Sequence, residues 1–559
     1  MAEMLTEPDE LLGELVLPTS NPVEWAFVVE VLGQPIERLA DLDTIITRFS
    51  ALDRDPRVCT FFATIPGSEE AGEFDFERFL ALGVPLIVDV ALEMPKLFDG
   101  IKVPIHMSRS SCAGPGNLGK RSFSLTRRQC ACLLAHSFFG SLKRPPAVHP
   151  NDFRFTVVDL FLGSARSPNS ATTFLNYFSV LGKNGVPDEF VTFERQGYRK
   201  GPPPWKWEES DAPLCAVDIV DGNIENSAAD LHAEFANAFV GGGVMTGDAA
   251  MEEMLFLVKP ELLVAMAIEN RMVDEEAICI SGARQYSLTT GFGHSFAFAG
   301  DYDDRRAGPP PRVCALDAIR GGGPAMTRPA LLRDMNKARV AFTGAQELAT
   351  GHWGCGAFGN HHDLMFLKQW LAASHAGVST VYYHDFNRNQ SHHIVPLVRK
   401  LRHLTVARLW AFLLEITGDL SSAARFSARV ADIAIGRVEI PTGRGGHGPS
   451  PTGAATAGDG GASSEGDAVA IAAGSAYAAA VGKATATRPV DEQPSASEPK
   501  VAFSIKELRA GTPAGVDPTH KESHLSAAEF EAHLGVTRSA WEQLPKWKRD
   551  KAKTRAGIF

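Results

Sequence analysis

The sequence lacks the segments that direct a chain into or across a membrane. No stretch has the ~20 uninterrupted apolar residues that a membrane-spanning helix needs. The first residues, "MAEMLTEPDELLGEL", are acidic and contain neither the basic start nor the apolar run of a signal peptide. We therefore expect an intracellular, soluble protein that does not bind membranes.

Cysteine is scarce, and none of it is spaced for metal binding. The 559 residues include 8 cysteines without a CxxC pair, so the sequence indicates neither a zinc site nor a disulfide framework. A reducing compartment is favoured. The adjacent His361 and His362 are interpreted as solvated loop residues rather than ligands. We expect no metal and no cofactor.

An excess of basic residues is also missing. Lys and Arg number 55 against 66 Asp and Glu, a formal net charge of −11. Such a charge argues against non-specific binding of nucleic acid by the whole molecule, so no direct DNA binding is expected. With 44% hydrophobic and 22% charged residues the chain is typical of globular proteins, and its length requires more than one domain.

Large apolar residues nearly disappear after residue 440. The stretch from 441 to 498 is rich in Gly, Ala, Ser and Pro, which cannot bury enough surface to offset the entropy of ordering. It is predicted to be a flexible linker. Aromatic and charged residues return in 499–559, which is enough for a small separate domain.

The residues before the linker divide into two regions. Residues 1–180 are predicted to be a helical accessory region, because segments such as "SLTRRQCACLLAHSFFGSL" have apolar residues at helical spacing. In 181–440, short β-rich runs such as "EFVTFERQG", "EAICISG" and "VSTVYYHDF" alternate with helical stretches. This alternation predicts a layered α/β domain with helices on both faces of a sheet.

A glycine triplet followed by a glutamate pair is the first candidate for chemistry. Gly241, Gly242 and Gly243 precede Glu252 and Glu253 in "FANAFVGGGVMTGDAAMEEMLF". Glycine permits positive φ and close approach of other groups to the backbone. Paired carboxylates suit acid and base catalysis. The alternative is a surface turn followed by a helix whose acidic first turn complements its dipole.

A second glycine-rich segment, "ATGHWGCGAFG", leads into a predicted helix. Its small residues leave backbone N–H groups free to converge on an anion, helped by the helix N-terminus. A simple tight turn is the alternative. The pattern is neither a Walker A loop nor GxGxxG. The two segments together suggest a phosphate-bearing ligand that contains a bond to be cleaved.

These motifs resemble the signature of the poly(ADP-ribose) glycohydrolases. The neighbouring segments "LTRRQCACLLAHSFF", "LVKPELL", "GARQYSLTTGF" and "RKLRHLTVARLWAFLLEI" agree with that family in order, so the resemblance covers about residues 110–420. It implies a macrodomain, a three-layer α/β/α sheet, preceded by helices. It also implies hydrolysis of the ribose–ribose bonds of poly(ADP-ribose) to ADP-ribose, with the polymer and ADP-ribosylated proteins as partners.

The resemblance also implies a role for each matching residue. Glu253 corresponds to the acid and base, Glu252 to the group that holds ribose hydroxyls, and Asn237 to a ribose contact. The other matched substrate contacts are Ile224 and Glu225 at adenine, Gly241, Gly242 and Gly243 beside the scissile bond, Tyr286 and Thr289 in the segment that usually carries a tyrosine, Gly354, Cys355, Gly356 and Ala357 at the diphosphate, and Phe358 at the distal ribose.

Three residues depart from the family pattern. Met251 replaces a glutamine, Glu234 an aspartate, and Thr289 a tyrosine that lies against the ligand. Loss of a stacking aromatic weakens binding by ~1–3 kcal/mol. These departures motivate a rival hypothesis, a non-catalytic ADP-ribose reader on the cytoskeleton. Cleavage of single ADP-ribose groups from proteins is a further alternative.

The C-terminal segment resembles the villin headpiece, a helical F-actin-binding module. Phe530, Leu534 and Trp541 match its core positions, and Glu522 and Lys553 match its buried ion pair. Residues 499–559 contain 11 basic and 7 acidic residues, a charge of +4 that suits an acidic filament. The alternative is a stable headpiece without affinity for actin. We expect a cytoplasmic or nuclear, actin-associated protein. The residues expected to contact actin are Lys521, Trp547, Lys548, Lys553 and Phe559.

Overall fold

The chain forms two compact units, Met1–Thr442 and Gly443–Phe559. The structure is a computed structural model, and the predicted linker at 441–498 lies outside the residues it describes. No helix among the described residues is long and apolar enough to cross a membrane. The described residues are 11–51, 57–68, 72–106, 118–146, 148–149, 152–162, 168–198, 201–304, 308–321, 323–385, 394–418, 423–434, 503–510 and 521–534, with Arg538, Trp541, Lys553 and Ala556.

The N-terminal region is helical, as predicted, and holds an aromatic-rich core. Its long helix α7 begins at a capping box in which Thr126 and Gln129 satisfy each other's backbone N–H groups. The elements are β1 (Leu11–Glu14), η1 (Pro18–Ser20), α1 (Pro22–Leu32), α2 (Leu39–Ser50), α3 (Phe61–Thr64), α4 (Phe76–Arg78), η3 (Phe79–Gly83), α5 (Val84–Leu92), α6 (Met94–Leu97), β2 (Pro104–His106), β3 (Gly119–Thr126), α7 (Arg127–Phe139), η4 (Val157–Leu160) and α8 (Pro168–Asn184).

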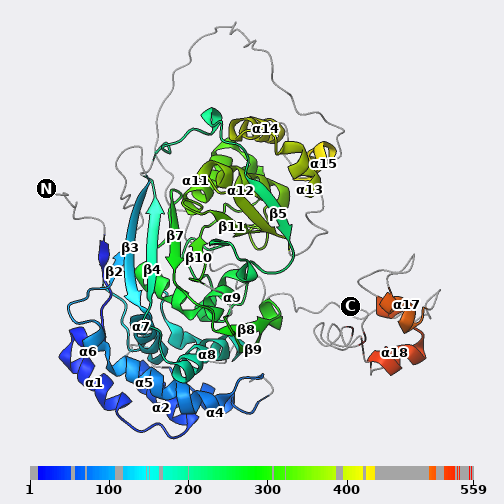
Figure 1. Cartoon of the computed structure of the whole chain (residues 1–559). Helices are drawn as coiled ribbons and strands as arrows, with labels where there is room; N and C mark the ends of the chain where they lie inside the picture. The colour runs from blue at the N-terminus through cyan, green and yellow to red at the C-terminus, as the bar shows by residue number, and fades with distance from the viewer. Residues whose placement is uncertain are drawn as a thin grey trace, which may run out of the picture. The chain divides into compact units, whose positions relative to one another are not determined.

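The sheet and the helices that follow occupy the rest of this unit (Figure 1). The elements are β4 (Phe190–Gly197), η5 (Trp207–Glu209), β5 (Ala216–Val220), η6 (Ile224–Asn226), β6 (Leu231–Glu234), η7 (Val244–Thr246), α9 (Met251–Val258), η8 (Pro260–Val264), α10 (Ala265–Ile268), β7 (Glu276–Ser281), β8 (Ser287–Thr290), η9 (Gly293–Ser295), β9 (Ala297–Asp301), β10 (Arg312–Ala315), η10 (Gly323–Met326), α11 (Arg328–Ala341), β11 (Glu347–Thr350), α12 (His362–Ala376), β12 (Thr380–His384), α13 (Ile394–Leu401), α14 (Val406–Gly418) and α15 (Ala423–Ala434).

One sheet of eight strands organises this unit, in the order β3-β4-β7-β10-β6-β11-β12-β5. Five strands, β10, β6, β11, β12 and β5, pair with one another in parallel. The pairs β3–β4, β4–β7 and β7–β10 are antiparallel, so β10 is parallel to β6 on one side and antiparallel to β7 on the other. The edge strand β3 lies in the region predicted to be a helical accessory region, so the helical region and the sheet are physically continuous.

Helices cover both faces of the sheet, as the alternation of strands and helices predicted. Along β7, Ile278 and Ile280 belong to a core shared with α7 and α8, whereas Ala277 and Cys279 belong to the opposite core with α11 and α12. Side chains of a strand alternate between faces, so both faces of β7 are buried. The result is the expected three-layer α/β/α arrangement (Figure 1).

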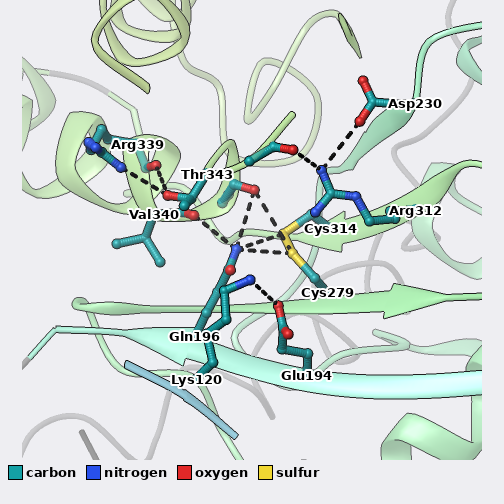
Figure 2. Close-up of a disulfide and its surroundings, with 12 residues drawn as sticks. Lys120, Glu194, Gln196, Asp230, Cys279, Arg312, Cys314, Arg339, Val340 and Thr343 are labelled. Atoms are coloured by element: carbon teal, nitrogen blue, oxygen red, sulfur yellow. Dashed lines mark hydrogen bonds and ion pairs between the residues drawn. A yellow bond between two sulfur atoms is a disulfide. The ribbon is translucent and has the colours of Figure 1, made fainter. Parts of the chain in front are cut away.

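A disulfide joins two of these strands, which corrects the expectation that the sequence holds none. Cys279 on β7 and Cys314 on β10 are directly opposite in the antiparallel register, with Cα atoms 4.1 Å apart. Figure 2 shows Gln196 beside the sulfurs; its Nε2 donates to Cys279 Sγ at 3.1 Å and to Val340 O at 2.9 Å. The 35-residue separation gave no local spacing signal, because the pairing follows from strand register.

The parallel strands bring the predicted site segments together. The carboxyl ends of parallel strands lie at one edge of a sheet. There β5 leads to Ile224 and Glu225, β6 leads to the glycine triplet, and β11 leads to the Gly354–Phe358 segment. Three segments far apart in the sequence therefore gather at a single edge.

The C-terminal unit has its own small core. It contains α17 (Ile505–Ala510), η11 (Lys521–His524) and α18 (Ala527–Leu534). Phe530, Leu534 and Trp541 pack together as predicted, and the rings of Phe530 and Trp541 meet edge to face at 5.3 Å. The predicted ion pair is confirmed: Lys553 Nζ lies 2.9 Å from Glu522 Oε1.

Candidate active site

The glycine triplet forms a loop that only glycine can build. Gly241 and Gly242 have φ of 89° and 49°, in the left-handed region. A Cβ on Gly242 would lie 2.8 Å from Glu252 Oε2 and closer still to Glu253 Oε1, and one on Gly241 would lie 2.6 Å from Met266 Sδ. A side chain on Gly242 would therefore displace both carboxylates.

The backbone of this loop holds the two glutamates. Both oxygens of Glu252 accept backbone hydrogen bonds, from Asn237 N at 2.8 Å and from Gly241 N at 2.7 Å. Glu253 Oε1 accepts from Gly243 N at 2.8 Å. The remaining oxygen, Glu253 Oε2, is buried and has no hydrogen-bond partner among the described residues. One carboxylate is thus fixed at both oxygens, and the other keeps one oxygen available.

Burial makes Glu252 bind a proton more readily than an ordinary carboxyl group does. Glu252 and Glu253 each expose 7% of their surface. Desolvation, followed by the charge of Glu253, raises the pKa of Glu252 to about 8, against the opposing effect of the backbone N–H donors and Arg154. Burial and the neighbouring glutamates also raise the pKa of Glu234, at the end of β6.

An arginine from the helical region, which the sequence analysis missed, reaches this loop. Arg154 Nη1 donates to Gly242 O at 3.3 Å, and the guanidinium lies 5.1 Å from the ring centroid of Phe239. The Phe239 amide in turn donates to Asn237 Oδ1 at 3.1 Å. No local motif marked Arg154, because its role depends on tertiary packing.

The second glycine segment differs from the glycine triplet because several of its backbone amides are not bonded to any side chain that the structure describes. Gly354 has φ of 68°, and a Cβ there would lie 2.7 Å from Ala318 Cβ, whereas a Cβ on Gly356 would meet nothing within 4 Å. Among the residues that the structure describes, no hydrogen-bond acceptor is found for the amides of Gly356, Ala357 and Phe358. These N–H groups, next to the start of α12, are available to an anion.

A second arginine missed by the sequence analysis lies beside this segment. Arg320 is exposed, and its guanidinium lies 5.0 Å from the ring centroid of Phe358. The backbone on both sides is fixed to the segment: Gly321 N donates to Phe358 O at 2.7 Å, and Asn360 Nδ2 donates to Ile319 O at 2.6 Å. A cation is therefore held next to the free amides.

The predicted adenine contacts line a small pocket. Ile224 and Glu225 lie on η6 and share this pocket with Glu234, Phe235 and Met251. Glu225 Oε2 is buried and has no hydrogen-bond partner among the described residues. Met251, the departure from the expected glutamine, contributes an apolar wall.

Tyr286 is buried in a hydrogen-bond network. Its hydroxyl donates to Glu261 Oε1 at 2.6 Å and accepts from Arg127 Nη1 at 3.0 Å. Its contact with substrate stays a prediction. Thr289 is half-buried on the β8–β9 hairpin, which is joined to the start of α9 by a 2.8 Å bond from Gly293 N to Ala249 O.

Two histidines and a thiol lie near the second segment. His362 starts α12 and packs against His352, which bonds to Asp385 at 3.0 Å. No group of three or more candidate ligands is found among the described residues. Burial raises the pKa of Cys355 to about 12, so its thiol is not a nucleophile at neutral pH.

Two of the residues predicted to contact actin, Lys521 and Lys553, lie among the described residues. Lys553 is 9% exposed and its Nζ lies 2.9 Å from Glu522, while its contact with F-actin stays a prediction. Lys521 is half-buried, with Nζ 3.5 Å from Leu508 O. Trp547, Lys548 and Phe559 lie outside the described residues.

Three protein-family descriptions match parts of the chain. Residues 59–195 match "Poly (ADP-ribose) glycohydrolase (PARG), helical domain", and 204–393 match "Poly (ADP-ribose) glycohydrolase (PARG), Macro domain fold". The two matches to this one family together span more than half of the chain. Residues 524–559 match "Villin headpiece domain".

Individual proteins are similar to parts of this chain. The chain is 28% identical over 426 residues to a probable poly(ADP-ribose) glycohydrolase 2 of Arabidopsis thaliana, covering 61% of this chain and 79% of that one. A segment of 66 residues is 36% identical to Talin-B of Dictyostelium discoideum, covering 12% of this chain and 2% of the other. A crystal structure of the Deinococcus radiodurans poly(ADP-ribose) glycohydrolase with ADP-ribose has 18% identity, a TM-score of 0.21 and coverage of 32% and 80%.

Proposed function

This chain belongs to the poly(ADP-ribose) glycohydrolase family, and we propose that Glu253 is its catalytic acid and base, with Glu252 and Asn237 holding the ribose. The observation that supports this assignment is the pattern of backbone hydrogen bonds. Donors occupy both oxygens of Glu252 but only one of Glu253. Glu253 Oε2 is therefore the one oxygen of the two carboxyl groups without a donor among the described residues, and we assign the proton transfers to it.

The proposed reaction is hydrolysis of the ribose–ribose bond of poly(ADP-ribose). Glu253 gives its proton to the departing ribose oxygen while the bond from the anomeric carbon to that oxygen breaks, which leaves an oxocarbenium-like centre. The Glu253 carboxylate then takes a proton from water as the water oxygen bonds to that carbon, so the acid is restored. Second lone pairs on the oxygens of Glu252 accept the ribose hydroxyls.

The same sheet edge supplies the rest of the substrate site. The free amides of Gly356, Ala357 and Phe358 bind the diphosphate, and Arg320 adds a positive charge there. Adenine enters between Ile224 and Phe235, and its exocyclic amine donates to Glu225 Oε2. These positions agree with the separation of the three loops along the strand order β6-β11-β12-β5.

Incubating the purified chain with labelled poly(ADP-ribose) tests this function. We expect release of free ADP-ribose, unaffected by a chelator. Retention of intact polymer on the protein without release would instead favour the non-catalytic reader, for which Met251 and Thr289 are the motivation. Release of ADP-ribose only from singly modified proteins would favour the third hypothesis.

A second function is carried by the C-terminal unit, which we propose binds F-actin and localises the enzyme. Its support is the headpiece match, the similarity to a segment of Talin-B and the packed core around Phe530. Lys521 and, outside the described residues, Trp547, Lys548 and Phe559 are the proposed contacts. Localisation at filaments, in the cytoplasm or nucleus, would raise the local concentration of enzyme.

Co-sedimentation with F-actin tests the second function. The full chain should sediment with filaments and a chain ending at residue 442 should not. Binding should weaken as salt rises, because a basic surface drives it. Equal sedimentation of the two chains would show that the C-terminal unit is not the actin-binding part.

A further inference from the structure

We propose that Arg154 is a positioning residue for catalysis, through which the helical region completes the active site. This inference rests on the proposed function of the glutamate pair. Arg154 precedes η4 in the segment 152–162, which lies in the part of the chain that matches the helical domain. Its guanidinium contacts the glycine loop that holds both carboxylates.

The contact falls at the centre of the loop. Arg154 Nη1 donates to the carbonyl of Gly242. The amide of the preceding residue, Gly241, donates to Glu252, and that of the following residue, Gly243, donates to Glu253. A single guanidinium therefore anchors the residue between the two donors. Movement of the Gly242 carbonyl would turn the flanking peptide groups and misalign both carboxylates.

A second contact fixes the guanidinium itself. Arg154 packs over the ring of Phe239 at 5.1 Å, a cation–π contact. The amide of Phe239 is bonded to Asn237, whose own amide donates to Glu252. Arg154 thus contacts the loop before and within the glycine triplet. The helical region and the sheet need to be present together for this arrangement.

The positive charge also acts on the acid pair. The charged groups that influence Glu252 and its neighbour Glu234 are Glu225, Glu253, Lys259 and Arg154. The positive charge of Arg154 lowers the pKa of Glu252. Removing the charge should raise the pKa of Glu252, so the alkaline fall in activity should move to higher pH.

Three variants of the full chain separate positioning from general stability. Arg154→Gln keeps an N–H donor without the charge, and Arg154→Lys keeps the charge. Arg144→Gln is the control, because Arg144 is another arginine of the helical region and donates to backbone carbonyls away from the glycine loop. We expect Arg154→Gln to lose about tenfold or more in turnover of the polymer. Its ADP-ribose Kd should stay within about threefold of wild type, because the diphosphate and adenine contacts remain.

The decisive readouts are the pH dependence and a titration that does not need turnover. In Arg154→Gln, the alkaline limb of the rate profile and the carbon-13 NMR titration of the labelled glutamate carboxyls should both move to higher pH than in wild type. Arg154→Lys should restore the wild-type position, and Arg144→Gln should leave it unchanged.

Two results would overturn the inference. One is a titration of the carboxyls in Arg154→Gln that superposes on that of wild type. The other is a loss of turnover in Arg144→Gln equal to that in Arg154→Gln. A wild-type chain that does not hydrolyse the polymer would refute the proposed function, while the NMR titration would still decide whether Arg154 acts on the pair.

Discussion

The two glycine-rich loops share a position in the fold but use their backbone in opposite ways. Both follow a parallel strand, β6 or β11, and both lead toward a helix, α9 or α12. In the first loop, the amides of Gly241 and Gly243 are occupied by the protein's own carboxylates. In the second, the amides of Gly356 to Phe358 have no acceptor among the described residues.

This difference indicates what each loop is for. A backbone whose donors are occupied by internal carboxylates fixes the groups that perform chemistry, and it binds no anion of its own. A backbone whose donors remain free can bind an anion that arrives with the substrate. The proposed enzyme therefore separates catalysis and diphosphate binding between two structurally related loops.

The largest effect on this comparison should come from Gly242→Ala. The new Cβ would displace both carboxylates, and φ of 49° is unfavourable for alanine. We expect turnover of the polymer to fall by about 10²-fold or more, because small displacements of catalytic groups have such effects. Binding of ADP-ribose, measured by calorimetry, should change much less. Near wild-type turnover would show that the glycine is not needed for the position of the pair.

The pH dependence of turnover should depend on the first loop and not on the second. Burial raises the pKa of Glu252 to about 8, so Glu252 holds a proton below that pH and loses it above. Turnover should then fall by about tenfold per pH unit in the alkaline range, as for loss of one required proton. Stopped-time assays from pH 6 to 10 measure this, with ADP-ribose Kd at each pH as a control. A rate that rises through pH 9 would contradict the proposal of a protonated acid.

Arg320→Ala should affect the second loop alone. Loss of the cation beside the free amides should weaken ADP-ribose binding by about tenfold, the usual magnitude for a hydrogen bond to a charged group. Adenosine, which has no phosphate, should bind as before. Arg320→Lys should recover part of the loss. If adenosine binding weakened equally, Arg320 would be acting on the shape of the pocket rather than on the diphosphate.

The smallest effect is expected from Gly356→Ala. A Cβ at this exposed position meets nothing within 4 Å, and the residue does not need positive φ. Both turnover and ADP-ribose Kd should stay within about twofold of wild type. A loss as large as that in Gly242→Ala would mean that the bound substrate approaches the Cα of Gly356 more closely than a methyl group allows.

The sequence predicted the main elements because their signals are local. Apolar spacing, glycine turns and short β-rich runs marked α7, α12, β7 and β12 in the places where they occur. The glycine triplet and the glutamates were informative because residues 241 to 253 are close in the chain. The motif resemblance then assigned them a chemistry that spacing alone could not.

The remaining features depend on contacts between distant segments. Cys279 and Cys314 pair through strand register, and Arg154 reaches Gly242 across 88 residues. The edge strand β3 has polar residues at alternating positions but gave no prediction, because its pairing with β4 is long-range. The buried network of Tyr286 gave no sequence signal for the same reason: its partners Glu261 and Arg127 lie far from it in sequence.

The central claim, that the glutamate pair performs the chemistry while the second loop binds the diphosphate, is tested most directly by Glu253→Gln in the full chain. Turnover of labelled poly(ADP-ribose) and the Kd for ADP-ribose should be measured on the same preparations. Glutamine keeps the shape of the side chain, and its oxygen can still accept from Gly243 N, but it cannot exchange the proton. We predict a loss of turnover of about 10³-fold with a Kd within about threefold of wild type. Turnover equal to wild type would contradict the account.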